Sequence, residues 1–236
     1  VDTELQKLSN KRETEQRTTL GGLVFEEALC GWLERAVQGS SDVASRTGNT
    51  TGLIKSNKVG DAVLELGPEH QAAGARIVLE AKEVAGYTLA RAREEIDEAR
   101  RNRGAGVGLF VFSRRTAPPN LRPLQRIGND VFVVWDSEDA TSDVQMEAAL
   151  AVARALAFRA GASRHDTVDL EKLDRAIRVV EKQAEGLEEI RRSAETISSG
   201  SQKILDRVRI LGDALGKAVV ELAGCSAAVT RALADG

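Results

Sequence analysis

Two acids and a lysine lie in a pattern that could support metal-assisted chemistry. Asp61 lies nineteen residues before Glu80. Glu80 begins the triplet Glu80-Ala81-Lys82, which ends a short apolar run. Because side chains alternate between the two faces of a strand, Glu80 and Lys82 share one face with Val78. Charged groups at the end of a buried strand are costly unless they are paired, hydrogen-bonded or bound to a metal. Two carboxylates and an amine can hold a hard cation beside a group that handles a proton or faces a phosphate.

The segments around these residues predict the elements that position them. Residues 58–66 and 76–82 have strand patterns, and the turn chemistry of 67–74 joins them as a hairpin or as adjacent strands. Thr88 is a suitable N-cap for a helix that ends near Arg103. Continuous apolar runs separated by a helix favour a mixed α/β sheet with covered faces. Further strands are expected at 107–113 and 131–135, a further helix at 146–160, and mostly loop, with one weak strand, at 39–57.

A helix expected from about residue 23 to 37 contributes one more acid. At about 100° per residue, Phe25, Leu29 and Trp32 form an apolar stripe. Glu26 lies at the edge of that stripe, whereas Glu27 faces away from it. Of the two acids, only Glu26 could therefore face a site built on the sheet.

The C-terminal part of the chain has a different period. From Leu170 onward, apolar or small residues alternate at spacings of three and four, with one slip between Leu187 and Ile190. The phase is kept across residues 198–201, which favours one continuous helix over a helical hairpin. An apolar seam of this length must pair with itself, with a second copy or with another protein.

Composition and charge limit the function classes. The chain has 236 residues and a net charge of −3, but the window from Lys82 to Arg126 holds ten basic and five acidic residues, a balance of +5 that suits a polyanion. Because acids interleave with these arginines, a solvated surface is the alternative interpretation. The candidate phosphate contacts are Arg91, Arg100, Arg103, Arg114 and Arg115.

Several other function classes have no signal in the sequence. No apolar run approaches the roughly 18 residues of a membrane helix, and no signal peptide is visible. Cys30 and Cys225 have no metal-ligand spacing and suit a reducing compartment. No Ser/His/Asp set, phosphate-binding loop or zinc spacing is present. We therefore expect a soluble cytoplasmic protein without an organic cofactor and without a membrane partner.

Gly60-Asp61 followed by Glu80-Ala81-Lys82 resembles the motif of the PD-(D/E)XK nuclease superfamily, with Gly60 where the motif has proline. The segment from Gly22 to Glu26 is similar to the GxxFE helix that precedes the motif in many members. The order of acidic helix, Asp strand, (D/E)XK strand, helix and strand also agrees, over roughly residues 20–135. The long helix after residue 166 resembles, less specifically, the coiled-coil extensions of bacterial members such as the RmuC-like proteins.

The resemblance implies a restriction-endonuclease-like fold and a Mg²⁺ site, with Mn²⁺ as the alternative ion. Asp61, Glu80 and the backbone carbonyl of Ala81 would hold the ion, and Glu26 would bind it directly or through water. Lys82 would orient or deprotonate the attacking water and help to neutralise the phosphate. The expected substrate is DNA.

The expected organisation is an N-terminal helical segment or linker at 1–19, a nuclease-like domain at 20–162 and a coiled-coil region at 166–224. Two alternatives remain open. In one, the nuclease fold is inactive and the chain is an interaction scaffold organised by its coiled coil. In the other, it is a nucleic-acid-binding module without chemistry, whose binding would depend on salt and not on Mg²⁺.

Overall fold

The computed structural model describes residues 20–161 and 170–234, and within them six strands form one mixed sheet in the order β1-β2-β3-β4-β6-β5. β1, β2 and β3 are antiparallel neighbours, whereas β3, β4 and β6 run parallel. β5 closes the far edge antiparallel to β6. The strands are β1 (Val43–Arg46), β2 (Ala62–Glu65), β3 (Arg76–Lys82), β4 (Val107–Ser113), β5 (Leu124–Ile127) and β6 (Asp130–Trp135).

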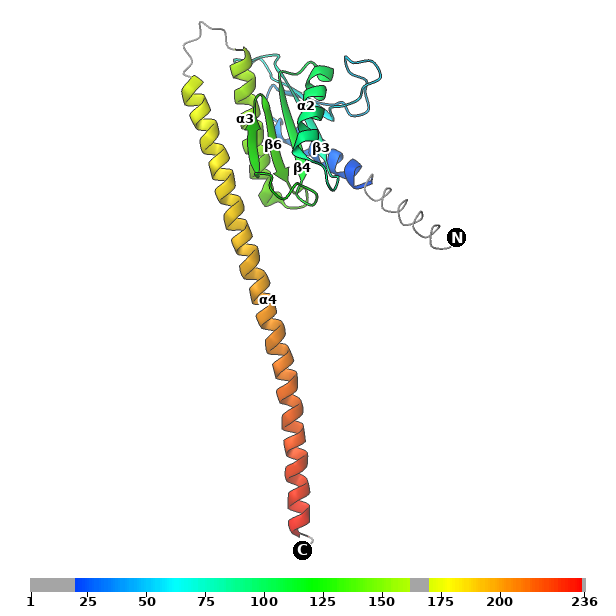
Figure 1. Ribbon diagram of the computed structural model, residues 1–236, viewed down its shortest axis with the longest axis vertical. Helices are drawn as coiled ribbons and strands as arrows, with labels where there is room; N and C mark the ends of the chain where they lie inside the picture. The colour runs from blue at the N-terminus through cyan, green and yellow to red at the C-terminus, as the bar shows by residue number, and fades with distance from the viewer. Residues whose placement is uncertain (1–19, 162–169, 235–236) are drawn as a thin grey trace, which may run out of the picture. The chain divides into compact units, whose positions relative to one another are not determined.

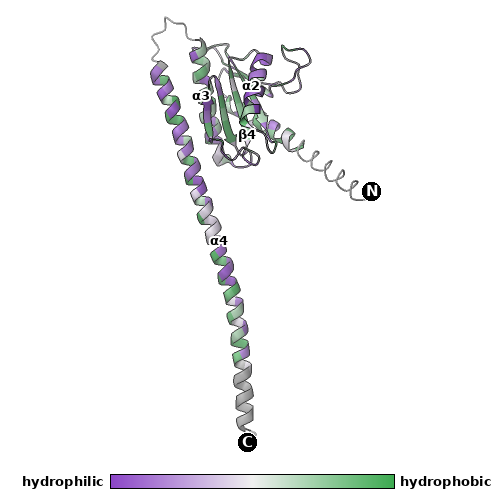
Figure 2. Ribbon diagram, viewed as in Figure 1, coloured by the Kyte–Doolittle hydropathy of each residue, from purple (hydrophilic) through white to green (hydrophobic). Residues whose placement is uncertain are grey.

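Helices cover both faces of this sheet (Figure 1). One face packs against α2 (Leu89–Arg103) and against Leu121 of the loop between β4 and β5. The other packs against a helix through residues 20–36, against α3 (Asp143–Gly161), which follows the short 3-10 turn η1 (Ala140–Ser142), and against the first turns of α4 (Leu170–Ala234). The expected α/β architecture with covered faces is therefore confirmed. In Figure 2 the central strand β4 is green and the helices mix green and purple, because β3, β4 and β6 are buried on both sides and the helices on one.

The elements on either side of the acid-lysine triplet form as their sequences predict. In β3, Ile77, Leu79 and Ala81 join the core under α3, while Val78 joins the core under α2. The hydroxyl of Thr88 accepts a hydrogen bond from the Arg91 N–H at 3.3 Å and caps α2. Gly104 ends the helix in the left-handed conformation at φ +61°. Local sequence therefore determines which side chains of β3 are buried before Lys82 and where α2 begins and ends after it.

Several predicted boundaries are wrong. The strand expected over 58–66 spans only Ala62–Glu65, because the backbone turns sharply at Gly60, where φ is +100°. Residues 124–127, which lack the pattern of a buried strand, form the edge strand β5. By contrast, the weak strand expected within 39–57 is confirmed, since it forms as β1 at one edge of the sheet. The helix expected from 23 extends through residue 20, and α3 starts three residues before the expected 146.

The helix α4 is continuous through residues 198–201, as the seam pattern predicts. The chain divides into two compact units between Glu185 and Gly186, so the first part of α4 belongs with the sheet. There Ile177 and Ala184 are buried in the core. No described helix is long and apolar enough to cross a membrane. The segment 1–19 and the boundary expected at 162–166 lie outside the described residues.

Candidate functional site

The last three residues of β3 extend past the end of its neighbour β2. β2 pairs with residues 76–79 of β3 and no further, so Glu80, Ala81 and Lys82 have no strand partner on that side. Asp61 occupies the space. Its N–H donates to the Leu79 carbonyl at 2.9 Å, and its Oδ2 accepts from the Ala81 N–H at 2.8 Å. The N–H and carbonyl of one strand residue point to the same side, so the Ala81 carbonyl also faces Asp61.

Glu80 is fixed in the same way by the turn before Asp61. The Gly60 N–H donates to Glu80 Oε2 at 2.8 Å, and the side chain is only 6% exposed. Asp61 and Glu80 therefore each use one carboxylate oxygen on a backbone N–H. The backbone contacts leave Asp61 Oδ1 and Glu80 Oε1 for other partners, and Oε1 lies 3.5 Å from the Lys82 ammonium.

The conformation of Gly60 explains why the position has glycine where the resembled motif has proline. A φ of +100° is strained for any residue with a side chain and is inaccessible to proline, whose φ is near −65°. A Cβ at this position would lie 2.8 Å from Arg103 Cγ and 2.9 Å from Val78 Cγ2. Glycine is thus required for the turn that brings its N–H to Glu80.

Lys82 lies between two carboxylates from different elements. Its ammonium is 2.8 Å from Oε1 of Glu95 on α2 and 3.5 Å from Oε1 of Glu80 on β3. The ring of Tyr87 lies beneath the ammonium, with its centroid at 5.3 Å. The Tyr87 hydroxyl donates to the other oxygen of Glu95, and its ring stacks on Phe110. The lysine is therefore held from three directions.

The charges of this cluster act on one another. Burial raises the pKa of Asp61 to about 6, helped by the negative charges of Glu26 and Glu95 and opposed by the Ala81 N–H and by Lys82. Burial and the charge of Asp61 raise the pKa of Glu80 well above its usual range. Burial also raises the pKa of Glu26, against the effect of Lys82.

The same interactions act on the lysine. Burial lowers the pKa of Lys82, but the carboxylates of Glu80 and Glu95 outweigh it, so the pKa of the ammonium is raised. The cluster thus contains four carboxyl groups and one ammonium. The guanidinium of Arg103 also interacts electrostatically with Glu80 and Asp61. A cation bound beside these two acids would favour their charged forms and lower their pKa values.

The structure brings together the expected site residues Asp61, Glu80, Ala81 and Lys82. Glu26 joins them electrostatically, because its charge acts on Asp61 and the charge of Lys82 acts on it. The exposed Glu27 instead pairs with Arg46, as expected for a residue that faces away.

Sequence reasoning missed Glu95, which it counted only as one of the acids between the arginines. The signal was present, because Glu95 lies three residues after Ala92 and four before Ala99, in phase with the buried stripe of α2. A carboxylate in that phase must face the sheet and find a partner there.

Arg103 corrects an expectation, because it is not available to a phosphate. Its guanidinium group is buried, and the residue is only 7% exposed. The guanidinium donates to the carbonyls of Thr47, Thr50, Lys58 and Val59 at 2.7–3.0 Å. The neighbouring Asn102 donates to the carbonyl of Val59 and accepts from the Ile54 N–H. These two side chains hold the loop from 47 to 60 against α2, and that loop positions Gly60 and Asp61.

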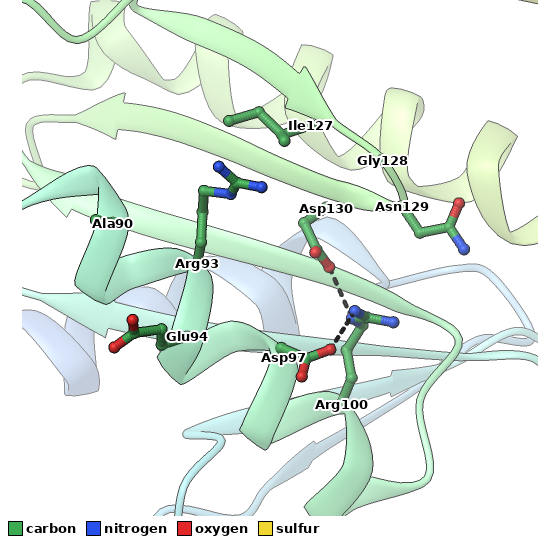
Figure 3. A pocket seen from close by; sticks show the side chains of 9 residues that line it. All are labelled: Ala90, Arg93, Glu94, Asp97, Arg100, Ile127, Gly128, Asn129 and Asp130. Carbon is green, nitrogen blue, oxygen red and sulfur yellow. Dashed lines mark hydrogen bonds and ion pairs between the residues drawn. The ribbon is translucent and has the colours of Figure 1, made fainter.

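The other four candidate arginines do not form one patch with the acid cluster. Arg115 pairs with Glu138 and Glu83, and Arg114 donates to Gln145. Arg91 is exposed in the first turn of α2. Arg100 points toward Asp97 and Asp130 at 2.7 and 2.8 Å in a cavity of about 770 Å³ between α2 and the β5–β6 turn (Figure 3).

The cavity around Arg100 is not strongly basic. It is lined by Arg93 and Arg100 and by three acids, Glu94, Asp97 and Asp130, and no residue of the acid cluster lines it. Contact of Arg91, Arg100, Arg114 and Arg115 with phosphate remains a prediction.

The donor set of the cluster fits a hard cation that keeps most of its water. Among the described residues, no group of three or more His, Cys, Asp or Glu side chains is placed to enclose a metal ion. A site here would therefore use Asp61, Glu80 and the Ala81 carbonyl, with water completing the shell. Mg²⁺ is usually bound in this way, through one or two carboxylates and several waters.

The chain matches no family model, no curated protein and no solved structure.

Proposed function

We propose that this protein is a Mg²⁺-dependent nuclease that hydrolyses phosphodiester bonds of DNA, with Mn²⁺ as an alternative ion. The observation that carries the proposal is the pair of acids formed by the buried Glu80 and the partly buried Asp61, whose second oxygens are left free by their backbone contacts. Lys82 lies beside them with its ammonium 3.5 Å from Glu80. Buried carboxylates with raised pKa values next to one amine are typical of functional sites.

The proposed chemistry divides the work among these residues. A bound Mg²⁺ would supply a water of lowered pKa and stabilise charge on the phosphate oxygens. Asp61, Glu80 and the Ala81 carbonyl would hold the ion, and Glu26 would orient water around it. The Lys82 ammonium would face the phosphate and stabilise the charge that develops on its oxygens during in-line attack. The backbone N–H groups of Gly60 and Ala81 keep both carboxylates in place without reorganisation.

The order of the elements supports the same proposal. An acid-bearing helix, an Asp before a strand, a strand ending in Glu-x-Lys, a helix and a parallel strand follow one another as expected for the PD-(D/E)XK superfamily. Membership in that superfamily, a restriction-endonuclease-like fold and a cytoplasmic location are parts of the proposal. The departure at Gly60 lies in the turn before Asp61, whose N–H donates to the Leu79 carbonyl of β3.

The test is a cleavage assay on mixed substrates: double- and single-stranded DNA and RNA, each with Mg²⁺, with Mn²⁺ and with EDTA. We expect metal-dependent cleavage by the wild-type protein and its loss in Asp61→Ala and Lys82→Ala. Lys203→Ala, which removes an exposed lysine from α4, is the matched control and should cleave normally. Metal-dependent cleavage that survives in Asp61→Ala and Lys82→Ala would refute the proposed roles, and metal-independent DNA binding without cleavage would indicate a binding module.

A second function is favoured by the far part of α4, which we propose to self-associate as a coiled coil with a second copy of the chain. Its seam residues are 60–71% exposed although they are large and apolar, which a helix in water does not sustain alone. These residues are Ile190, Ile197, Ile204, Val208, Leu211, Leu215 and Leu222. In an inactive scaffold, this association would be the whole function.

Sedimentation or light scattering of the purified full chain tests the seam. We expect an oligomer, and we expect Ile197→Glu with Ile204→Glu to dissociate it, because charges in the seam cannot be paired there. Gln202→Glu adds a charge off the seam and should leave the oligomer intact. A monomeric wild-type chain would contradict self-association and would assign the seam to another protein.

A further inference from the structure

Lys82 is held by an acid that does not belong to the strand motif. Its ammonium lies 2.8 Å from Glu95 Oε1 on α2, closer than the 3.5 Å to Glu80 Oε1 on its own strand. The second oxygen of Glu95 accepts from the Tyr87 hydroxyl, so both oxygens of this carboxylate are engaged. The Glu95 carboxylate is therefore held in place, and the Lys82 ammonium lies closer to it than to Glu80.

The position of the ammonium matters because it competes with a metal ion. Glu80 Oε1 is the oxygen that the Gly60 N–H leaves free, and it is also the oxygen nearest to the ammonium. An ammonium that moved from 3.5 Å into full hydrogen-bond contact would neutralise Glu80 and occupy a ligand position. The flexible four-carbon stem of lysine allows such a movement. Loss of the Glu95 carboxylate would leave Glu80 as the nearest carboxylate to which the ammonium could move.

We propose that Glu95 is a positioning residue that holds Lys82 off Glu80 and thereby sets the affinity of the acid pair for a divalent cation. The inference rests on the proposed function, because it assumes that Asp61 and Glu80 bind the ion. Glu95 itself does not coordinate the ion in this proposal, and the larger part of its effect passes through Lys82, beside the direct effect of its charge on Asp61 and Glu80.

The test is a double-mutant cycle with Mn²⁺ binding as the readout, measured by calorimetry on the full chain without nucleic acid. Glu95→Gln should weaken Mn²⁺ binding about tenfold, in the range found for residues that orient metal ligands. In a Lys82→Met background, which keeps an apolar stem and removes the ammonium, Glu95→Gln should weaken binding by no more than about threefold, because only the direct charge of Glu95 on Asp61 and Glu80 is then lost. Equal losses in both backgrounds would overturn the inference, since Glu95 would then act by its own charge or as a ligand.

Two further variants, Glu95→Asp and Tyr87→Phe, test the positioning role of Glu95 independently of Glu95→Gln. Glu95→Asp retains the carboxylate but shortens its reach, and we expect a smaller loss in the same direction, so the proposal can be judged even if Glu95→Gln folds poorly. Tyr87→Phe removes the donor to the second Glu95 oxygen and retains the ring under the ammonium, so we expect a loss smaller than that of Glu95→Gln. An unchanged affinity in both Glu95→Asp and Glu95→Gln would refute the positioning role. A wild-type protein that binds no Mn²⁺ would instead refute the proposed function.

Discussion

Replacement of Asp61 by asparagine should remove activity and stabilise the fold in the absence of metal. The Asp61 carboxylate is partly buried and its pKa is raised to about 6, whereas an aspartate in an unfolded chain has a pKa of about 3.9. About two pKa units correspond to about 3 kcal/mol of unfolding free energy at neutral pH, which is an upper estimate because Asp61 and Glu80 titrate together. The amide oxygen of asparagine can still accept from the Ala81 N–H. We expect a gain of about 1–3 kcal/mol at about pH 7.5.

The gain should depend on pH in a defined direction. Below about pH 4 Asp61 is protonated in both folded and unfolded chains, so its charge has no cost. Between about pH 4 and 6 the unfolded chain loses this proton while the folded chain keeps it, and the stability of the wild-type protein falls as pH rises. The asparagine side chain of the variant has no proton to lose. The difference between variant and wild type should therefore open between about pH 4 and 6 and persist above.

Urea denaturation followed by circular dichroism, in EDTA and at several pH values, measures this difference. Glu69→Gln, which removes one carboxylate from an exposed turn, is the matched control and should change stability by less than about 0.5 kcal/mol. Two results would refute this prediction. In one, Asp61→Asn has no larger unfolding free energy than wild type at about pH 7.5; in the other, the difference is as large at about pH 4 as at neutral pH.

Two further predictions concern the loop that positions Asp61. Gly60→Ala should cost about 3 kcal/mol of unfolding free energy, because the variant combines a positive φ with contacts of 2.8–2.9 Å to Arg103 and Val78; a loss below about 1 kcal/mol in urea denaturation would contradict the turn geometry. Arg103→Met should cost roughly 3 kcal/mol, because buried loop carbonyls lose their donor, whereas Arg101→Met on the exposed side of α2 should stay within about 0.5 kcal/mol in the same assay. Equal effects of the two arginine variants would show that the loop does not depend on Arg103.

The parts of the fold that depend on local pattern could be predicted from the sequence. Alternation placed Glu80 and Lys82 on one face of β3, and the Thr88 cap and the glycine at 104 bounded α2. The helical period indicated that Glu26 lies at the edge of the apolar stripe and that Glu27 faces away from it. In each case the signal lies within one element, where the period of the side chains decides which face is buried.

The parts that depend on contacts between distant segments could not be predicted. Arg103 looked like one more arginine in a basic window, and only the folded loop shows that its guanidinium meets carbonyls more than forty residues away. β5 is an edge strand whose pairing with β6 comes from a tight turn rather than from an apolar run. Glu95 carried a readable helical phase, but its partner Lys82 lies on another element.

Anomalous diffraction from crystals of the protein soaked in Mn²⁺ would locate a metal ion at Asp61 and Glu80 directly. We predict one strong peak at the end of β3, about 2.0–2.2 Å from a carboxylate oxygen of Asp61 and one of Glu80, with the Ala81 carbonyl facing it. The peak should be absent in Glu80→Gln crystals soaked in the same way. A peak elsewhere on the protein, or no peak at millimolar Mn²⁺, would contradict a metal-dependent site built on these residues.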